Sequence, residues 1–267
     1  MARVPTRGGA VHRVRRQALL EIAIQAARAA ARALLAQRPF ASRLRRKLEK
    51  DVKIEADFLA DGLIRDRLRA ASSFPICSEE DQTHCGAAQR SSYWWIVDPL
   101  AGSLNFFRGI PWSCVSIALW HGMEPVLGVI HDVHRHETFS GLAGHGAWLD
   151  GSPIEVSRVR AQDRAVLCTG FPARTDYDAS SLLAFVHSVQ AYQKVRLLGS
   201  AALSLAYVAC GRTDVYEERH IALWDVAAGL AIVKAAGGAI AFRMTDKDQT
   251  LIVRAANRFL LSQRAFL

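Results

Sequence analysis

Strand-like and helical segments alternate along the second half of the sequence, and this alternation limits the folds that the chain can adopt. The expected strands and helices follow one another at 166–169, 180–189, 194–197, 200–211 and 214–217. A long helix is expected after Trp224-Asp225, and the paired glycines at 237 and 238 favour its end there. Strands and helices in this order pack as layers, so the sequence predicts an α/β or α+β sandwich.

The first half is expected to hold two helices followed by several strands. Apolar residues recur at helical spacing at 16–37 and again at 55–71, which predicts a helix in each range. Apolar, small and β-branched residues favour strands at 94–97, 113–119, 126–132, 137–141 and 147–149. His121-Gly122 and Asp150-Gly151 are expected to form turns between strands.

A chain of 267 residues is long enough for two sub-domains with an extensive core. We expect a basic tail at 1–16, an N-terminal α+β sub-domain at 17–160 and a C-terminal α/β sub-domain at 161–267. Asp225 and Lys234 interrupt the apolar stretch 223–241, so no run reaches the roughly 20 residues that cross a bilayer. We therefore expect a soluble, cytoplasmic protein.

Positive charge is concentrated at the N-terminus. Residues 1–50 contain 13 lysines and arginines and two acids, a net charge of +11, whereas the remainder carries −2. Such a segment is typical of mitochondrial transit peptides and of patches that bind nucleic acid or acidic partners. The helical spacing of Leu19, Ile22, Ala26 and Leu34 favours a third interpretation, a first helix with a solvated basic face.

The five cysteines show no spacing typical of a zinc site; they are Cys77, Cys85, Cys114, Cys168 and Cys210. Their number is odd, and all except Cys85 lie among apolar residues. We therefore expect free thiols in a reducing compartment rather than disulfides.

Three histidines, His131, His134 and His136, lie close together in the sequence. His134 and His136 alternate as exposed strand residues would. A zinc site is the minor alternative at this position.

Acidic residues cluster in three places where a strand or loop is expected to meet a helix. The clusters are Ser78-Glu79-Glu80-Asp81, the segment 98–106 that begins with Asp98-Pro99, and Trp224-Asp225. Carboxylates gathered in one cleft repel one another unless a cation neutralises them, and oxygen-only ligands favour a hard ion such as Mg²⁺. The Gly102-Ser103 turn can also present backbone N–H groups to a phosphate.

Two of these segments resemble the signatures of the inositol monophosphatase family. Residues 98–106, Asp-Pro-Leu-Ala-Gly-Ser-Leu-Asn-Phe, are similar to the family's Asp-Pro-(Ile/Leu)-Asp-Gly-Thr-x-Asn-Phe. Residues 224–229, followed by Ala236-Gly237-Gly238, are similar to its second signature. The resemblance covers nearly the whole chain. It implies a layered α/β/α/β/α sandwich of the inositol monophosphatase and fructose-bisphosphatase type, and a homodimer.

The resemblance also implies a magnesium-dependent, lithium-sensitive phosphomonoesterase site. Its metal ligands would be Glu79, Asp98, Asp225 and the backbone carbonyl of Leu100, and the intact family site holds two or three Mg²⁺ ions. Such ions lower the pKa of the attacking water and stabilise the leaving alkoxide.

The catalytic residues implied are Glu79, Ser103 and Asp57. Glu79 would help to orient the attacking water. Ser103 stands where the family usually has threonine and keeps the hydroxyl that positions this water. Asp57 would support the water through that hydroxyl.

The resemblance assigns the substrate contacts to four residues. The amides of Gly102 and Ser103 would hold the phosphate group. Ala201 and Glu218 match positions that contact the alcohol part of the substrate.

Ala101 departs from the family pattern, which has a metal-binding aspartate at this position. A methyl group cannot coordinate Mg²⁺, so the second ion loses a ligand and one negative charge. The first site keeps its ligands. We predict weaker binding of the second ion and activity reduced by orders of magnitude. An Asp-to-Ala change made by design and a natural loss in a degenerate homologue both fit the sequence.

The function implied is hydrolysis of a small phosphate monoester, such as an inositol phosphate, a nucleotide 3′-phosphate or a similar phosphorylated metabolite. Residues 78–81 resemble the branch that removes the 3′-phosphate of adenosine bisphosphate, whereas 102–106 resemble the inositol monophosphatase branch. The alternative is a catalytically weak homologue that binds nucleic acid or protein as a regulator, which the basic N-terminal segment would suit.

Overall fold

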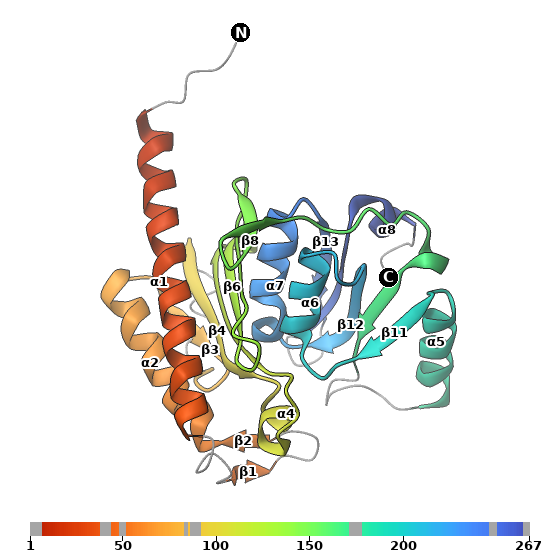
Figure 1. Ribbon diagram of the computed structural model, residues 1–267, viewed down its shortest axis with the longest axis horizontal. Coiled ribbons are helices and arrows are strands. Elements are labelled where there is room, and N and C mark those ends of the chain that lie inside the picture. The colour runs from red at the N-terminus through yellow and green to blue at the C-terminus, as the bar shows by residue number, and fades with distance from the viewer. Residues whose placement is uncertain are drawn as a thin grey trace.

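The helices and strands of the chain form five layers (Figure 1). The computed structural model describes residues 7–37, 44–47, 52–82, 85, 92–170, 178–245 and 250–263. Two helices cover one face of a seven-stranded sheet, two more lie between this sheet and a five-stranded sheet, and further helices lie beyond the second sheet. The layered α/β/α/β/α sandwich is therefore confirmed.

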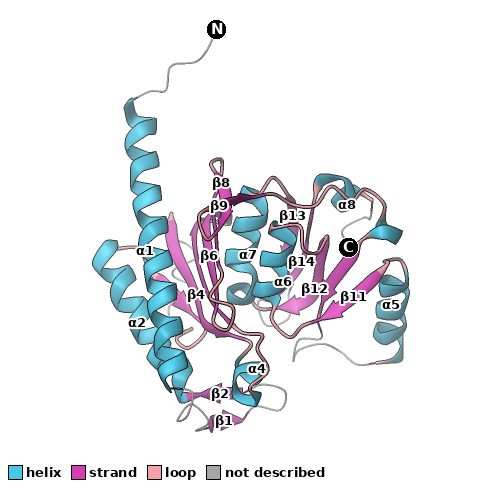
Figure 2. Cartoon of the chain, in the orientation of Figure 1, coloured by secondary structure: helices cyan, strands magenta, loops and turns pink. Residues whose placement is uncertain are grey.

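The first helical layer consists of α1 (Arg7–Gln37) and α2 (Glu55–Ala71). It packs on a sheet whose strands, in spatial order, are β3 (Ile76–Ser78), β4 (Tyr93–Ala101), β5 (Cys114–His121), β6 (Glu124–Asp132), β7 (Thr138–Leu142), β8 (Gly146–Leu149) and β9 (Ser152–Ile154). Among the described strands of this sheet, only β3 and β4 are parallel neighbours. Beside it lie the hairpin of β1 (Leu44–Lys47) and β2 (Val52–Ile54) and the helix α4 (Ser103–Arg108) (Figure 2).

The middle layer consists of α6 (Ala201–Ala209) and α7 (Leu223–Ala235). The second sheet has the strand order β11 (Lys194–Leu197), β10 (Val166–Thr169), β12 (Val215–Ile221), β14 (Leu251–Ala256) and β13 (Ala239–Met244). On its outer side lie α5 (Ala179–Gln190) and α8 (Arg258–Ser262), and the 3₁₀ turn η1 (Gln162–Arg164) precedes β10.

Alternate residues of β4 enter two different cores. Trp94 and Ile96 pack with residues of α6 and α7, whereas Trp95 and Val97 pack under α1 and α2. Because both faces of the strand are covered, it reads as a continuous apolar run rather than an alternating one. Asp98, on the same strand, therefore lies in a buried environment.

Several expected elements are confirmed to the residue, and others are shifted. The bounds of α2, β10 and β11 are those expected from the sequence. Helix α1 instead begins at Arg7, within the segment expected to be a tail. Arg15 lies over the ring of Phe74, and Arg16 Nη2 donates a hydrogen bond of 2.9 Å to the Tyr93 hydroxyl. These two arginines therefore help to attach α1 to the body of the protein.

The expected turn at Asp150-Gly151 is confirmed. Leu149 pairs with Ser152, so two residues connect β8 to β9. Both turn residues have positive φ, 48° at Asp150 and 83° at Gly151. This is the backbone of a type I′ turn, which follows the twist of a hairpin and favours an Asp-Gly pair.

The predicted arrangement of the histidines is wrong. His134 and His136 lie in a turn after β6 rather than on a strand, and His136 has a φ of 59°. His131 lies on β6, where burial is the main cause that lowers its pKa to about 4. Its Nδ1 lies 3.0 Å from the Thr138 hydroxyl. The neutral His131 ring is therefore part of the packing between β6 and β7.

The described helices include none with both the length and the apolar character that a membrane crossing requires.

Candidate active site

Glu79 follows the carboxyl end of β3, and Asp98 lies on the parallel neighbour β4 just beyond the last residue that pairs with β3. Ser78 on β3 pairs with Val97 on β4, and the Glu79 amide donates a 3.0 Å hydrogen bond to the Val97 carbonyl. The next residue on each strand is therefore one of the predicted metal ligands. The carboxyl ends of parallel strands are common ligand sites in open α/β sheets.

The chain after Asp98 folds back on itself through side-chain contacts. Asp98 is buried, and its Oδ1 accepts a 3.0 Å hydrogen bond from the Leu100 amide. The Ser103 hydroxyl lies 2.8 Å from the Leu100 carbonyl oxygen and 3.4 Å from Asp57 Oδ1. Its single proton can go to either acceptor. Ser103 thus contacts two other predicted catalytic or metal-binding residues, Asp57 and Leu100.

Several carboxylates converge on Cys114 of β5. Burial raises the pKa of the Cys114 thiol well above its usual range, and the negative charges of Asp98, Asp132 and Asp225 raise it further. These carboxylates come from β4, from the end of β6 and from the first turn of α7. The structure therefore brings Asp225 to the same region as Asp98, although they are far apart in the sequence.

Ala101 lies beside this region. It pairs with Cys114 across β4 and β5 and is buried within the core that includes α6 and α7. An aspartate here would place a further carboxylate next to Cys114. The alanine leaves an apolar surface there instead.

Glu218 occupies a buried position on β12. Its pKa is raised to about 7, chiefly by burial, while a 2.8 Å hydrogen bond from the Tyr216 hydroxyl to Oε2 opposes that rise. A Cβ on Gly170 would lie 2.8 Å from both carboxylate oxygens, so the Glu218 carboxylate packs directly against that glycine. The negative charges of Glu218 and Asp225 both raise the pKa of Tyr216, which links this group to the region around Asp98.

Asn105 connects the segment after β4 to the start of α6. Its Nδ2 donates to the carbonyls of Trp112 (2.9 Å), Leu198 (3.1 Å) and Gly199 (3.3 Å). The next residue, Ser200, caps α6 and leads into Ala201. Ser200 Oγ lies 3.8 Å from Cys114 Sγ. The predicted substrate residue Ala201 is therefore anchored next to the carboxylate region.

The sequence analysis missed three residues of this region: Cys114, Asn105 and Tyr216. Tyr216 has a visible signal, because it precedes Glu218 by two residues on a strand and so shares its face. Asn105 belongs to the signature at 98–106, but its bonds to Leu198 and Gly199 have no signal in the sequence, and neither does the position of Cys114.

The prediction that all cysteines are free is wrong. Cys77, on β3, and Cys85 form a disulfide, with Cα atoms 4.6 Å apart. The intervening chain turns back toward β3: the Asp81 amide donates to the Ser78 carbonyl, and the Cys85 amide donates to the Gln82 carbonyl. Composition could not show this turn. The other three cysteines, Cys114, Cys168 and Cys210, are free as predicted.

The donor set is suited to a hard cation but incomplete. Within the ranges that the structure describes, no three His, Cys, Asp or Glu side chains are placed together as a metal cluster. The candidate donors are oxygen atoms only, from Glu79, Asp98, Asp225 and the Leu100 carbonyl, which is the chemistry that Mg²⁺ prefers. With Ala101 in the sequence, these residues fit one ion better than a pair.

The fold is thus a layered α/β/α/β/α sandwich. Its candidate site has oxygen donors only and lies where the pairing of β3 with β4 ends. A model described as "Inositol monophosphatase family" matches residues 15–265. The chain belongs to this family.

The relatives carry two kinds of name. The chain is 39% identical over 210 residues to a Xylella fastidiosa protein named Nus factor SuhB, a match that covers 75% of each chain. It is 35% identical over 228 residues to an inositol-1-monophosphatase of Rhizobium meliloti, covering 84% of this chain and 85% of that protein. The structure is similar to that of the extragenic suppressor protein suhB from Bartonella henselae, with a TM-score of 0.80 at 31% identity, over 91% of this chain and 95% of the other.

Proposed function

We propose that this chain is a metal-dependent phosphatase that hydrolyses a small phosphate monoester, and that Ala101 limits its activity. The observation that carries this proposal is the register of β3 and β4, in which Glu79 and Asp98 each directly follow the paired residues Ser78 and Val97. Family membership and the contacts of Ser103 with Asp57 and Leu100 support it.

Glu79, Asp98, Asp225 and the Leu100 carbonyl would hold Mg²⁺. The bound ion supplies Lewis-acid chemistry to the phosphate and lowers the pKa of a water. Ser103 then has the role of orienting that water, because its hydroxyl already lies between the Leu100 carbonyl and Asp57. Glu79 serves both as ligand and as the second group that orients the water.

The substrate contacts divide between two sides of the site. The amides of Gly102 and Ser103 would receive the phosphate, at the N-terminus of α4. Ala201 and Glu218 would face the alcohol part. The carboxyl group of Glu218 is a hydrogen-bonding group for substrate hydroxyls, so we propose a small phosphorylated alcohol as substrate. An inositol phosphate, a nucleotide 3′-phosphate and a related metabolite all meet this description.

The test is magnesium-dependent phosphate release from a panel of these esters by the chain itself, by Ala101→Asp and by Ala101→Asn. The asparagine is a matched control of nearly the same size, without the charge that a second ion needs. We expect Ala101→Asp to exceed the other two by about 100-fold or more. Absence of hydrolysis by all three forms would overturn the proposal.

A second candidate is a regulator of transcription or of RNA, favoured by the Nus factor names of relatives and by the basic N-terminal segment. We propose that the basic residues of the N-terminal segment attract such a partner. The test removes residues 1–14, because Arg15 and Arg16 contact the body and should stay. RNA binding that weakens steeply with salt and is lost on truncation supports this role; equal binding by both forms contradicts it.

We also propose a homodimer, as in the family, and light scattering of the purified chain tests it. A monomer at micromolar concentration would contradict this expectation.

A further inference from the structure

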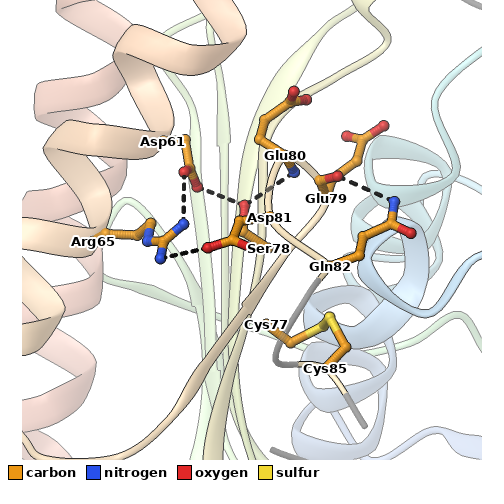
Figure 3. The surroundings of a disulfide bond; sticks show 9 residues. All are labelled: Asp61, Arg65, Cys77, Ser78, Glu79, Glu80, Asp81, Gln82 and Cys85. Atoms are coloured by element: carbon orange, nitrogen blue, oxygen red, sulfur yellow. Dashed lines mark hydrogen bonds and ion pairs between the residues drawn. A yellow bond between two sulfur atoms is a disulfide. The ribbon is translucent and has the colours of Figure 1, made fainter.

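The loop that carries Glu79 is held by contacts on both sides of that residue (Figure 3). Glu79 lies between Ser78, which contacts Asp61 of α2, and Asp81, which pairs with Arg65 of the same helix. It also lies within the ring closed by the Cys77–Cys85 disulfide. Neither the contacts with α2 nor the disulfide supplies a ligand atom of the proposed metal site.

The first device is an ion bridge made by Arg65 of α2. Arg65 Nη2 lies 2.8 Å from Asp81 Oδ2, and its Nη1 lies 3.4 Å from Asp61 Oδ2. Asp61 in turn accepts a 2.5 Å hydrogen bond from the Ser78 hydroxyl. The Arg65 side chain is only 15% exposed, so these contacts are screened less than those of a surface pair. One guanidinium therefore ties both flanks of Glu79 to the same helix.

The second device is covalent. The disulfide joins the end of β3 to Cys85 and so limits the conformations open to the residues between them. Within that ring, Gln82 Nε2 donates to the Glu79 carbonyl at 3.2 Å, and the Glu80 amide lies 3.3 Å from the Ser78 hydroxyl. The backbone of Glu79 is thus fixed by its own loop as well as by α2.

The Glu79 side chain stays outside these contacts. In Figure 3 its carboxylate points away from Arg65 and from the disulfide. Arg65 and the cysteines thus act on the neighbours of Glu79 in the chain.

We propose that Arg65 and the Cys77–Cys85 disulfide are positioning elements that hold Glu79 in place for metal binding, so that reduction of the disulfide weakens that binding. The inference rests on the proposed role of Glu79 as a metal ligand. A ligand held in its bound conformation loses less conformational freedom when the ion arrives, and this raises affinity. Residues that support metal ligands typically contribute about 10- to 100-fold to affinity.

The reduction is an ordinary thiol–disulfide exchange with a dithiol. One thiolate of the dithiol attacks a cysteine sulfur, the Cys77–Cys85 bond breaks, and a mixed disulfide forms. The second thiol of the dithiol then displaces the remaining cysteine. Two electrons and two protons pass to Cys77 and Cys85, and the dithiol ends as its own disulfide.

The experiment measures Mn²⁺ binding by calorimetry, without any phosphate ester. Arg65→Gln and Asp81→Asn are compared with Arg67→Gln, an exposed arginine of the same helix whose guanidinium donates to the Leu63 carbonyl one turn earlier. We expect Arg65→Gln and Asp81→Asn each to lose about 10-fold in Mn²⁺ affinity and Arg67→Gln to lose none. Circular dichroism of each variant verifies folding, and unchanged affinity in a folded Arg65→Gln and Asp81→Asn overturns the role of the bridge.

The disulfide is tested by treating the chain and Cys85→Ser with a small dithiol, which is removed anaerobically before titration. We expect reduction to weaken Mn²⁺ binding by the unmodified chain and to leave Cys85→Ser, already weakened, unchanged. If reduction weakens Mn²⁺ binding equally in both proteins, another group is responsible and the role of the disulfide is overturned. Unchanged binding by the reduced, unmodified chain overturns it as well. Absence of Mn²⁺ binding by every form would overturn both the positioning role of Arg65 and the disulfide and the proposed metal site. Mn²⁺ binding that depends on Arg65 and the disulfide, without phosphate release, would support their positioning role and contradict the proposed phosphatase activity.

Discussion

Ala101 stands where the family signature has an aspartate. Ala101 pairs with Cys114, whose thiol senses the charges of Asp98 and Asp225. A carboxylate at this position would therefore join two others in a buried region, where only a cation makes such crowding favourable. The alanine removes one negative charge from that region. The family resemblance predicts weaker binding of a second ion, and the strand pairing places position 101 opposite Cys114.

Glu218 provides a residue-scale prediction about pH. Its pKa in the folded chain is raised to about 7 by burial, above the value of about 4.5 in the unfolded chain. The folded state thus binds a proton that the unfolded state has lost, so stability should fall as pH rises from about 4.5 to 7. Glu218→Gln, which can still accept the Tyr216 hydrogen bond, should remove this loss. We expect the variant to gain up to roughly 3 kcal/mol relative to the parent between pH 5 and pH 8.

Denaturant unfolding of the metal-free protein at these two pH values measures that difference. Glu155→Gln is a suitable control, because Glu155 pairs with Arg158 at an exposed site. A stability difference between Glu218→Gln and the parent that stays constant with pH would contradict the assignment.

At the scale of elements, close packing of α7 fixes where Asp225 can lie. A Cβ on Gly128 of β6 would lie 2.3 Å from the Ala228 carbonyl of α7, so the helix backbone rests directly on the sheet. A second glycine, Gly229, lets α7 approach Leu205 of α6 equally closely. Helix α7, which carries Asp225 in its first turn, is therefore held close to the sheet and to α6.

This packing predicts opposite effects for two glycine-to-alanine changes. Gly128→Ala should destabilise the chain by about 1–3 kcal/mol or more, because a buried methyl group has no room beside backbone atoms. Gly62→Ala, on the exposed face of α2 where an added methyl group would meet open space, should stabilise it by up to about 1 kcal/mol. Thermal unfolding measures both. Equal effects of the two changes would show that α7 can move away from the sheet at little cost.

The sequence predicted the elements with a clear pattern and missed others, among them β3 and β14. Helix α2 was predicted to the residue because its buried Ala60, Ile64 and Leu68 recur at helical spacing. Strand β3 has three residues, too few for a period, although its pairing with β4 creates the site. Strand β14 was missed because it is buried along its whole length and shows no alternation.

At the scale of the whole molecule, the site is assembled from both halves of the chain. Glu79 and Asp98 belong to the first sheet, Asp225 to the central helical layer and Glu218 to the second sheet. Asn105 joins these halves through its bonds to Leu198 and Gly199. The family signatures located the individual residues, but the effect of the Asp98 and Asp225 charges on Cys114 depends on contacts between distant segments. The disulfide was not predicted for a different reason: its cysteines are only eight residues apart, and composition does not show the local turn that brings them together.

The most direct test of this account is the number of Mn²⁺ ions that the chain and Ala101→Asp bind. Mn²⁺ accepts the same oxygen ligands as Mg²⁺, and calorimetric titration gives stoichiometry and affinity without depending on a substrate. We predict one ion on the chain as it stands, and a second ion on Ala101→Asp but not on Ala101→Asn. Identical stoichiometry and affinity in all three forms would contradict the claim that position 101 is the missing ligand of this site.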